Sequence, residues 1–203
     1  MTRAGHVAHR VYDPVLRTLH GVNALLIVLL GAGGVAADNL SPGAARAWLH
    51  DTHGLLGAAL IVGLCCRLVW GWVGPAHARW RDLWHPADWR AQLARGRLFT
   101  APQRPGHHPV ASLAYLSVYA LLVALAASGL SLLASTQGAG PLAPVFAWDA
   151  RLTTWLADPH RLAAWAVLLF VCVHLAALVL HARLHRVPVA QSMWSGVQYL
   201  EPK

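Results

Sequence analysis

The sequence predicts an all-α integral membrane protein, a four-helix bundle with both termini on the cytoplasmic side. Of its 203 residues 57% are hydrophobic and 12% are charged, whereas charged residues make up about a quarter of an ordinary soluble domain. Four apolar stretches are long enough to cross a hydrocarbon core of about 30 Å as helices, the form in which the backbone satisfies its own hydrogen bonds without water. The expected spans are residues 18–37, 53–73, 110–134 and 161–180.

The orientation follows from the uneven distribution of positive charge. Basic residues gather before the first span, between the second and third, and after the fourth, while acidic residues offset the few arginines of the other two connections. By the positive-inside rule, both termini and the central connection are cytoplasmic. The net charge of +8 therefore reflects membrane orientation, and no nucleic acid is expected as a partner. The gathered residues are Arg3, Arg10, Arg17, Arg79, Arg81, Arg90, Arg95, Arg97, Arg104, Arg183, Arg186 and Lys203.

The first span is expected to remain in the protein as a membrane helix. Its apolar run is longer than the roughly 7–15 residues of a signal-peptide core. Val35-Ala36-Ala37 resembles a cleavage site, which leaves a cleaved signal peptide as the alternative. Cleavage there would remove His20, a residue that the candidate site requires.

A single membrane domain, residues 1–203, is expected. Its longest connection, residues 74–108, mixes tryptophan with arginine, a combination that favours the lipid headgroup layer. We expect this segment to lie along the cytoplasmic membrane surface, with a short helix beginning at Pro86. It is either a simple connector or a docking site for a redox partner or an anionic lipid. Residues 145–156 are expected to form an interfacial helix, and the third span, which carries no histidine, is expected to close the bundle.

Four histidines in or beside the spans form the candidate site. His160 and His174 lie fourteen residues apart in one apolar stretch, a step that returns to within about 40° of the same helix face after about 21 Å. His20 opens the first span and His53 opens the second. Depth pairs His53 with His160 near the outer side, and His20 with His174 near the inner side. These are called the outer pair and the inner pair below.

Two imidazoles at each level indicate haem as the bound group. A bare metal ion would require three or four converging ligands, whereas two trans histidines are the axial ligands of a six-coordinate haem b. The cysteines Cys65, Cys66 and Cys172 lie inside spans and form no Cys-x-x-Cys-His motif, so covalent haem attachment is not expected. A haem-free membrane transporter of a transition metal is an alternative. His50, one turn before His53, is an alternative outer ligand.

The fourteen-residue step recurs on the first two spans. Arg67 follows His53 by fourteen residues, and Gly34 follows His20 by fourteen. A buried arginine in a span requires an anionic partner, such as a haem propionate or a carboxylate. A glycine at the position of Gly34 leaves room for a flat porphyrin, and close helix packing explains it equally well.

Several motifs are spread along the chain. They are Asp-Pro-Val-Leu-Arg-Thr-Leu-His at 13–20, His-Gly-Leu-Leu-Gly at 53–57, Arg-Leu-Val-Trp-Gly-Trp-Val-Gly-Pro at 67–75, Gly-His-His-Pro at 106–109, and His160 to His174 followed by Leu184-His185-Arg186. These motifs resemble those of the bacterial cytochrome b561 and nickel–iron hydrogenase b-type cytochrome subunit family, and the resemblance covers nearly the whole chain. The departures are His108 where asparagine is usual, Gly54 where glutamate is common, and Arg161 where glutamate follows the histidine. The changes at Gly54 and Arg161 are expected to make the surroundings of the outer pair more positive.

The resemblance implies a cytochrome of the bacterial cytoplasmic (inner) membrane with two b haems. The inner haem is held by His20 and His174, and the outer haem by His53 and His160. Electrons pass between the quinone pool and a redox partner such as cytochrome c, a hydrogenase subunit or a dehydrogenase subunit. The alternative is a stand-alone quinone-reducing oxidoreductase, such as a superoxide oxidase. Candidate anchors for a propionate or quinone are Arg17, Arg67 and Arg79 on the inner side and Arg161 on the outer side.

Overall fold

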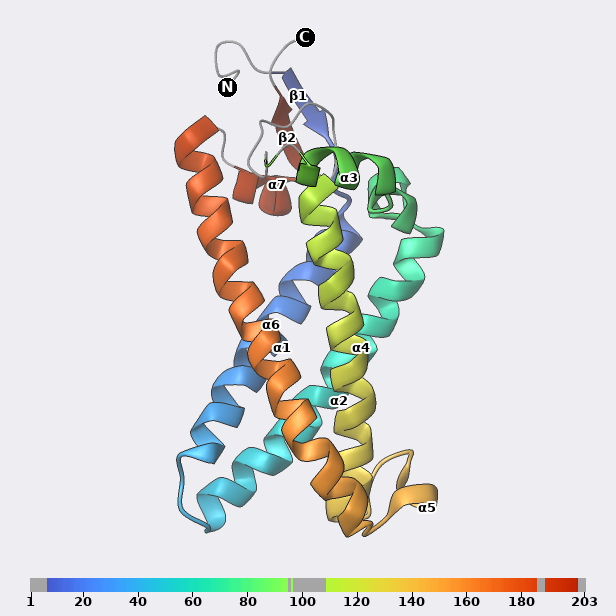
Figure 1. Cartoon of the computed structure of the whole chain (residues 1–203), viewed down its shortest axis with the longest axis vertical. Helices are drawn as coiled ribbons and strands as arrows, with labels where there is room; N and C mark the ends of the chain where they lie inside the picture. The colour runs from blue at the N-terminus through green and yellow to red at the C-terminus, as the bar shows by residue number, and fades with distance from the viewer. Residues whose placement is uncertain (1–6, 95, 97–108, 186–188, 201–203) are drawn as a thin grey trace. The chain divides into compact units, whose positions relative to one another are not determined.

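The computed structural model describes residues 7–94, 96, 109–185 and 189–200. Its four long helices are α1 (Pro14–Asp38), α2 (Ala44–Val73), α4 (Pro109–Gln137) and α6 (Ala150–His185) (Figure 1). All four are long and apolar enough to cross a membrane, so the four expected spans are confirmed as helices. Apolar side chains such as Leu25, Val62 and Leu169 point outward on these helices, as expected of surfaces that face lipid.

The helices extend beyond the expected spans, and this corrects the place of two histidines. α2 begins at Ala44 and α6 at Ala150, so His53 and His160 lie about two and a half turns inside their helices, not in the first turn. Asp149 explains the early start of α6, because its Oδ1 accepts hydrogen bonds from the N–H groups of Arg151 and Leu152 at 3.0 and 3.1 Å. This is an N-cap, which starts a helix whatever the hydropathy of its first turns.

The prediction of one interfacial helix over residues 145–156 is wrong. A single turn, α5 (Ala143–Phe146), is followed by a bend in which Trp148 has a φ of 61°. That left-handed conformation ends α5. The residues after Asp149 already belong to α6.

The chain forms two compact units. The first unit comprises residues 1–21, 65–117 and 172–203, and the second comprises residues 22–64 and 118–171. Each of the four long helices contributes one segment to each unit. His20, Arg67 and His174 belong to the first unit, whereas His53 and His160 belong to the second.

In the first unit the two ends of the chain pair with each other, which the sequence did not predict. β1 (Val7–Arg10) runs antiparallel to β2 (Val197–Leu200), which follows the short helix α7 (Val189–Ser195) (Figure 1). Gly196, with a φ of 78°, makes the turn between α7 and β2, and its carbonyl accepts hydrogen bonds from the N–H groups of Val11 and Tyr12 at 2.9 and 3.2 Å. A Cβ at Gly196 would lie 2.6 Å from the carbonyl oxygen of Tyr12, so glycine is required there.

Asp13 starts α1 and ties it to α2. Its Oδ1 accepts a hydrogen bond from the N–H of Leu16 at 3.0 Å, and Pro14 is the first helical residue, the usual arrangement of an N-cap followed by proline. Its Oδ2 accepts a hydrogen bond from the indole of Trp70 at 3.4 Å. The Asp-Pro pair at 13–14 therefore has a structural role in this chain.

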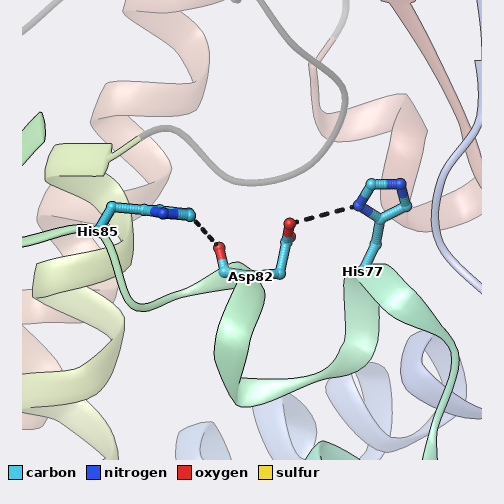
Figure 2. Close-up of polar contacts among 3 residues, drawn as sticks. All are labelled: His77, Asp82 and His85. Atoms are coloured by element: carbon cyan, nitrogen blue, oxygen red, sulfur yellow. Dashed lines mark hydrogen bonds and ion pairs between the residues drawn. The ribbon is translucent and has the colours of Figure 1, made fainter.

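The described part of the connection after α2 belongs to the first unit. Residues 74–94 contain two 3-10 turns, η1 (Ala76–Ala78) and η2 (Trp80–Asp82), and the helix α3 (Pro86–Ala94), which confirms the short helix expected at Pro86. Figure 2 shows Asp82 joining the turns, with its Oδ1 3.4 Å from Nδ1 of His77 and its carbonyl accepting a hydrogen bond from Nε2 of His85 at 2.8 Å. The rest of the connection, including His107 and His108, lies outside the described residues.

The burial of Tyr12 can be tested through the pH dependence of the free energy of unfolding. Burial raises the pKa of the Tyr12 hydroxyl above its usual value of 10.0, and nearby Tyr115 and Asp82 raise it further. The unfolded chain therefore loses this proton first, so the free energy of unfolding is unaffected below the usual pKa and falls above it, by up to about 1.4 kcal/mol per pH unit. Thermal unfolding in detergent between about pH 9 and pH 12 measures this slope. Tyr12→Phe is expected to reduce it, and an equal reduction in the control Tyr199→Phe would contradict the assignment.

Candidate functional site

The outer pair comes together in the second unit. The rings of His53, on α2, and His160, on α6, have their centroids 6.4 Å apart with an interplanar angle of 70°. A metal–nitrogen bond of about 2 Å to each ring, with about 1 Å more to each ring centre, separates two trans imidazoles by about 6 Å. The pair therefore has the spacing that a shared haem iron requires.

Polar groups of neighbouring helices lie beside both rings of the outer pair. Nδ1 of His160 lies 2.8 Å from the hydroxyl oxygen of Ser128, on α4. The ring of His53 lies close to the backbone of Leu30, on α1. Imidazoles that bind metals commonly hold the second ring nitrogen in this way, because the second hydrogen bond sets the tautomer and the ring orientation.

A cavity of about 700 Å³ adjoins the outer pair. Segments of α1, α2, α4 and α6 line it, and both histidines are among the lining residues. This volume lies within the usual range for bound cofactors and other small molecules. Its lining is mostly apolar, as expected of a haem pocket that must exclude water.

Glycines face both rings of the outer pair. A Cβ at Gly34 would lie 3.8 Å from Cε1 of His53, and a Cβ at Gly129 would lie 3.3 Å from Cε1 of His160. Gly57 lines the same cavity, and a Cβ there would meet no atom within 4 Å. Gly31 differs, because a Cβ there would lie 2.6 Å from Leu168 and its role is close helix packing. Both explanations of the glycines therefore apply, at different positions. Gly31 allows close helix packing, whereas Gly34 lies beside the ring of His53.

Arg161 and His50, the other two candidates for the outer site, lie at the margin of the cavity. Arg161 lines it, with a side chain that is 57% exposed and an Nη2 that lies 3.8 Å from Oδ1 of Asp158. His50 also lines it but is exposed, and its Nε2 accepts a hydrogen bond from Nε of Arg46 at 3.5 Å. The ring contact with His160 is made by His53.

The inner pair lies in the first unit. His20, on α1, and His174, on α6, are close enough to interact electrostatically. The ring of Tyr115, on α4, packs edge-on against His174 with centroids 5.9 Å apart. The sequence pattern does not single out this tyrosine, because the fourteen-residue histidine spacing involves no residue of α4.

Arg67 has an aromatic neighbour that the sequence did not reveal. Arg67 is only 5% exposed, and its guanidinium lies 4.9 Å from the ring centre of Trp80. This is a cation–π contact. The indole donates a hydrogen bond to the carbonyl of Leu68 at 3.2 Å. Gly71 leaves space for this ring, because a Cβ there would collide with it. Trp80 thus holds the arginine in place from outside α2.

Arg17 is engaged with the C-terminal segment. Its Nη1 donates a hydrogen bond to the carbonyl of Trp194 at 2.5 Å. Its Nε is buried and has no hydrogen-bond partner within the described part of the chain. Arg17 therefore has a structural role at α7, and one buried donor remains for an anionic group.

The third span does more than close the bundle. α4 contributes Ser128 and Gly129 beside His160, and Tyr115 beside His174. A serine followed by a glycine inside an apolar span was the available signal. In the ranges that the structure describes, no group of three or more His, Cys, Asp or Glu side chains forms a metal-ion site.

Four membrane-length helices, with imidazoles from two of them facing each other beside an apolar cavity, define a multi-pass membrane protein of the cytochrome type. The family model described as prokaryotic cytochrome b561 matches residues 11–196. The chain belongs to this family, and it is a b-type membrane cytochrome in electron transfer.

Curated relatives are similar over most of their length. A protein of Azotobacter vinelandii, named a probable Ni/Fe-hydrogenase B-type cytochrome subunit, is 28% identical over 92% of this chain and 86% of its own. Proteins with the same name from Azotobacter chroococcum mcd 1 and Bradyrhizobium diazoefficiens are 29% and 28% identical. These alignments cover 81% and 92% of this chain, and 77% and 84% of the relatives. No solved structure matches the chain significantly.

Proposed function

We propose that this cytochrome holds two b haems and carries electrons across the bacterial inner membrane between a redox partner and the quinone pool. The observation that carries the proposal is the outer pair, whose rings lie 6.4 Å apart beside a cavity of about 700 Å³. The ring spacing, the hydrogen bond between His160 and Ser128, and the facing glycines all suit a planar group bound between His53 and His160.

A second haem is proposed for the inner pair. Each unit contains one of the two proposed histidine pairs, drawn from two helices. His20 and His174 lie close enough in the first unit to interact electrostatically, and His53 and His160 make a ring contact in the second. The fourteen-residue step between His160 and His174, which is a rise of about 21 Å in a helix, supports two levels within one membrane.

The residues of this chain have separate tasks in such a protein. When bound, the haems supply one-electron redox chemistry. His53 and His160 would hold the outer iron, and His20 and His174 would hold the inner one. Gly34 would leave room for the outer porphyrin, and the buried guanidinium of Arg67 would compensate negative charge at the inner haem.

The partner and the orientation belong to the same proposal. Relatives named as hydrogenase cytochrome subunits favour a hydrogenase-type partner, with cytochrome c or a dehydrogenase subunit as the other candidates. The arginine distribution favours a cytoplasmic side for both termini and the inner pair. Family membership favours these proposals over a haem-free metal transporter. Rapid quinone reduction by the purified protein alone would favour the stand-alone oxidoreductase instead.

Redox-titrated spectra of the wild type, His174→Ala and His53→Ala test the ligand assignment. Each substitution is expected to remove one haem, and the two variants are expected to lose different ones. His50→Ala is the matched control for His53→Ala, and it is expected to keep both haems because the ring against His160 is that of His53. Two intact haems in both His174→Ala and His53→Ala would overturn the assignment.

A further inference from the structure

Ser128 is a polar residue in the apolar part of α4, and it contacts a histidine of the outer pair. Its hydroxyl oxygen lies 2.8 Å from Nδ1 of His160. The next residue, Gly129, lies against Cε1 of the same ring. The ring of His160 is thus held by α4 at two neighbouring positions, on the side of the ring that bears Nδ1.

The single hydroxyl proton of Ser128 is donated within α4. The Oγ donates a hydrogen bond to the carbonyl of Ala124 at 2.7 Å, with the carbonyl of Leu125 at 3.3 Å as a second acceptor. A serine hydroxyl has one proton and two lone pairs. Towards His160 the oxygen therefore accepts, and Nδ1 of the imidazole carries the proton. A neutral imidazole protonated at Nδ1 presents its lone pair at Nε2, the nitrogen left for a metal.

We propose that Ser128 is a positioning residue that fixes the Nδ1–H tautomer of His160 and lowers the reduction potential of the outer haem. This inference rests on the proposed function, in which His160 is a ligand of that haem. A hydrogen bond from Nδ1–H to an acceptor makes the imidazole a more basic ligand. A more basic axial ligand stabilises the oxidised iron, so the haem accepts an electron less readily.

Redox titration of Ser128→Ala tests the inference, with each haem followed separately. The equilibrium constant for reduction of the outer haem is expected to rise about tenfold, which for one electron is about 59 mV. The inner haem is expected to titrate as in the wild type. Electron paramagnetic resonance of the oxidised protein provides a second measurement, and only the outer low-spin signal is expected to shift. Neither measurement depends on turnover.

Two other variants separate positioning from packing. Ser131→Ala is the matched control, because Ser131 lies one turn along α4 and donates to the carbonyl of Ala127 at 2.9 Å. Together with Ser128 and His160 it lines a second, smaller cavity. It is expected to leave both haems unchanged. Ser128→Thr keeps a hydroxyl and is expected to restore the wild-type potential. Should Ser128→Ala lose the outer haem, Ser128→Cys replaces it in the test, because a thiol is a weaker acceptor and is expected to give a smaller shift in the same direction.

An unchanged outer potential in Ser128→Ala, or an equal shift in Ser131→Ala, would overturn the inference. If Ser128→Cys is the variant tested, an unchanged potential of the outer haem would also overturn the inference. His160→Ala separates this result from a failure of the proposed function. If His160→Ala keeps both haems, the ligand assignment itself is wrong. If it loses one haem while the Ser128 variants titrate as the wild type, the ligand assignment stands and only the role of Ser128 is rejected.

Discussion

Replacing Gly129 with leucine is expected to remove the outer haem and to leave the inner haem bound. A Cβ at this position already lies 3.3 Å from Cε1 of His160, which is tighter than ordinary contact. The further carbons of leucine would have to displace the imidazole or occupy the cavity beside it. Overpacking of this kind costs about 1–3 kcal/mol, which corresponds to a loss of about 5- to 150-fold in haem affinity. The haem content per protein, measured in the purified variant, is expected to fall by about half.

Two further substitutions on α4 test the steric reason. Gly129→Ala places only the first carbon against the ring and is expected to weaken haem binding less than leucine does. Ala120→Leu places the same side chain at an exposed position of the helix, and it is expected to retain both haems. Full haem content with an unchanged spectrum in Gly129→Leu would contradict the position of His160 described above.

Replacing Arg67 with glutamine is expected to lower the midpoint potential of the inner haem. The guanidinium is almost fully buried beside Trp80, and a positive charge with so little solvent around it stabilises the added electron. At an effective dielectric constant near 20, the loss of such a charge is worth about 2 kcal/mol, or roughly 90 mV for one electron. Redox titration of the two haems measures this shift, and the outer haem is expected to keep its potential.

Two arginine variants serve as controls for this prediction. Arg67→Lys keeps the charge but loses the planar stacking on Trp80, so its inner potential is expected to stay close to that of the wild type. Arg161→Gln removes an outer arginine that is 57% exposed and lies beside the exposed Asp158. Solvent screens such a charge, and only a small shift is expected there. A shift in the midpoint potential of the outer haem in Arg67→Gln would contradict the assignment of Arg67 to the inner pair.

The four helices could be predicted because hydropathy is a local property of the chain. Each span is a continuous apolar run, and the helix period places residues fourteen apart on one face. The same two rules are enough to select His53, His160 and His174. They failed at the start of α6, where Asp149 caps the helix through a hydrogen bond that carries no hydropathy signal. They also failed at β1 and β2, because two short strands from opposite ends of the chain are recognisable only once they pair.

By itself, then, the sequence determined the membrane helices, their arginine-rich connections and the histidines expected to pair. Only the tertiary structure decided what surrounds those histidines and Arg67: Ser128 and Gly129 beside His160, Tyr115 beside His174, and Trp80 over Arg67. The physical reason is that period and hydropathy report which face of a helix turns inward. They do not report which residue of another helix meets that face, because this depends on the rotation and packing of neighbouring helices.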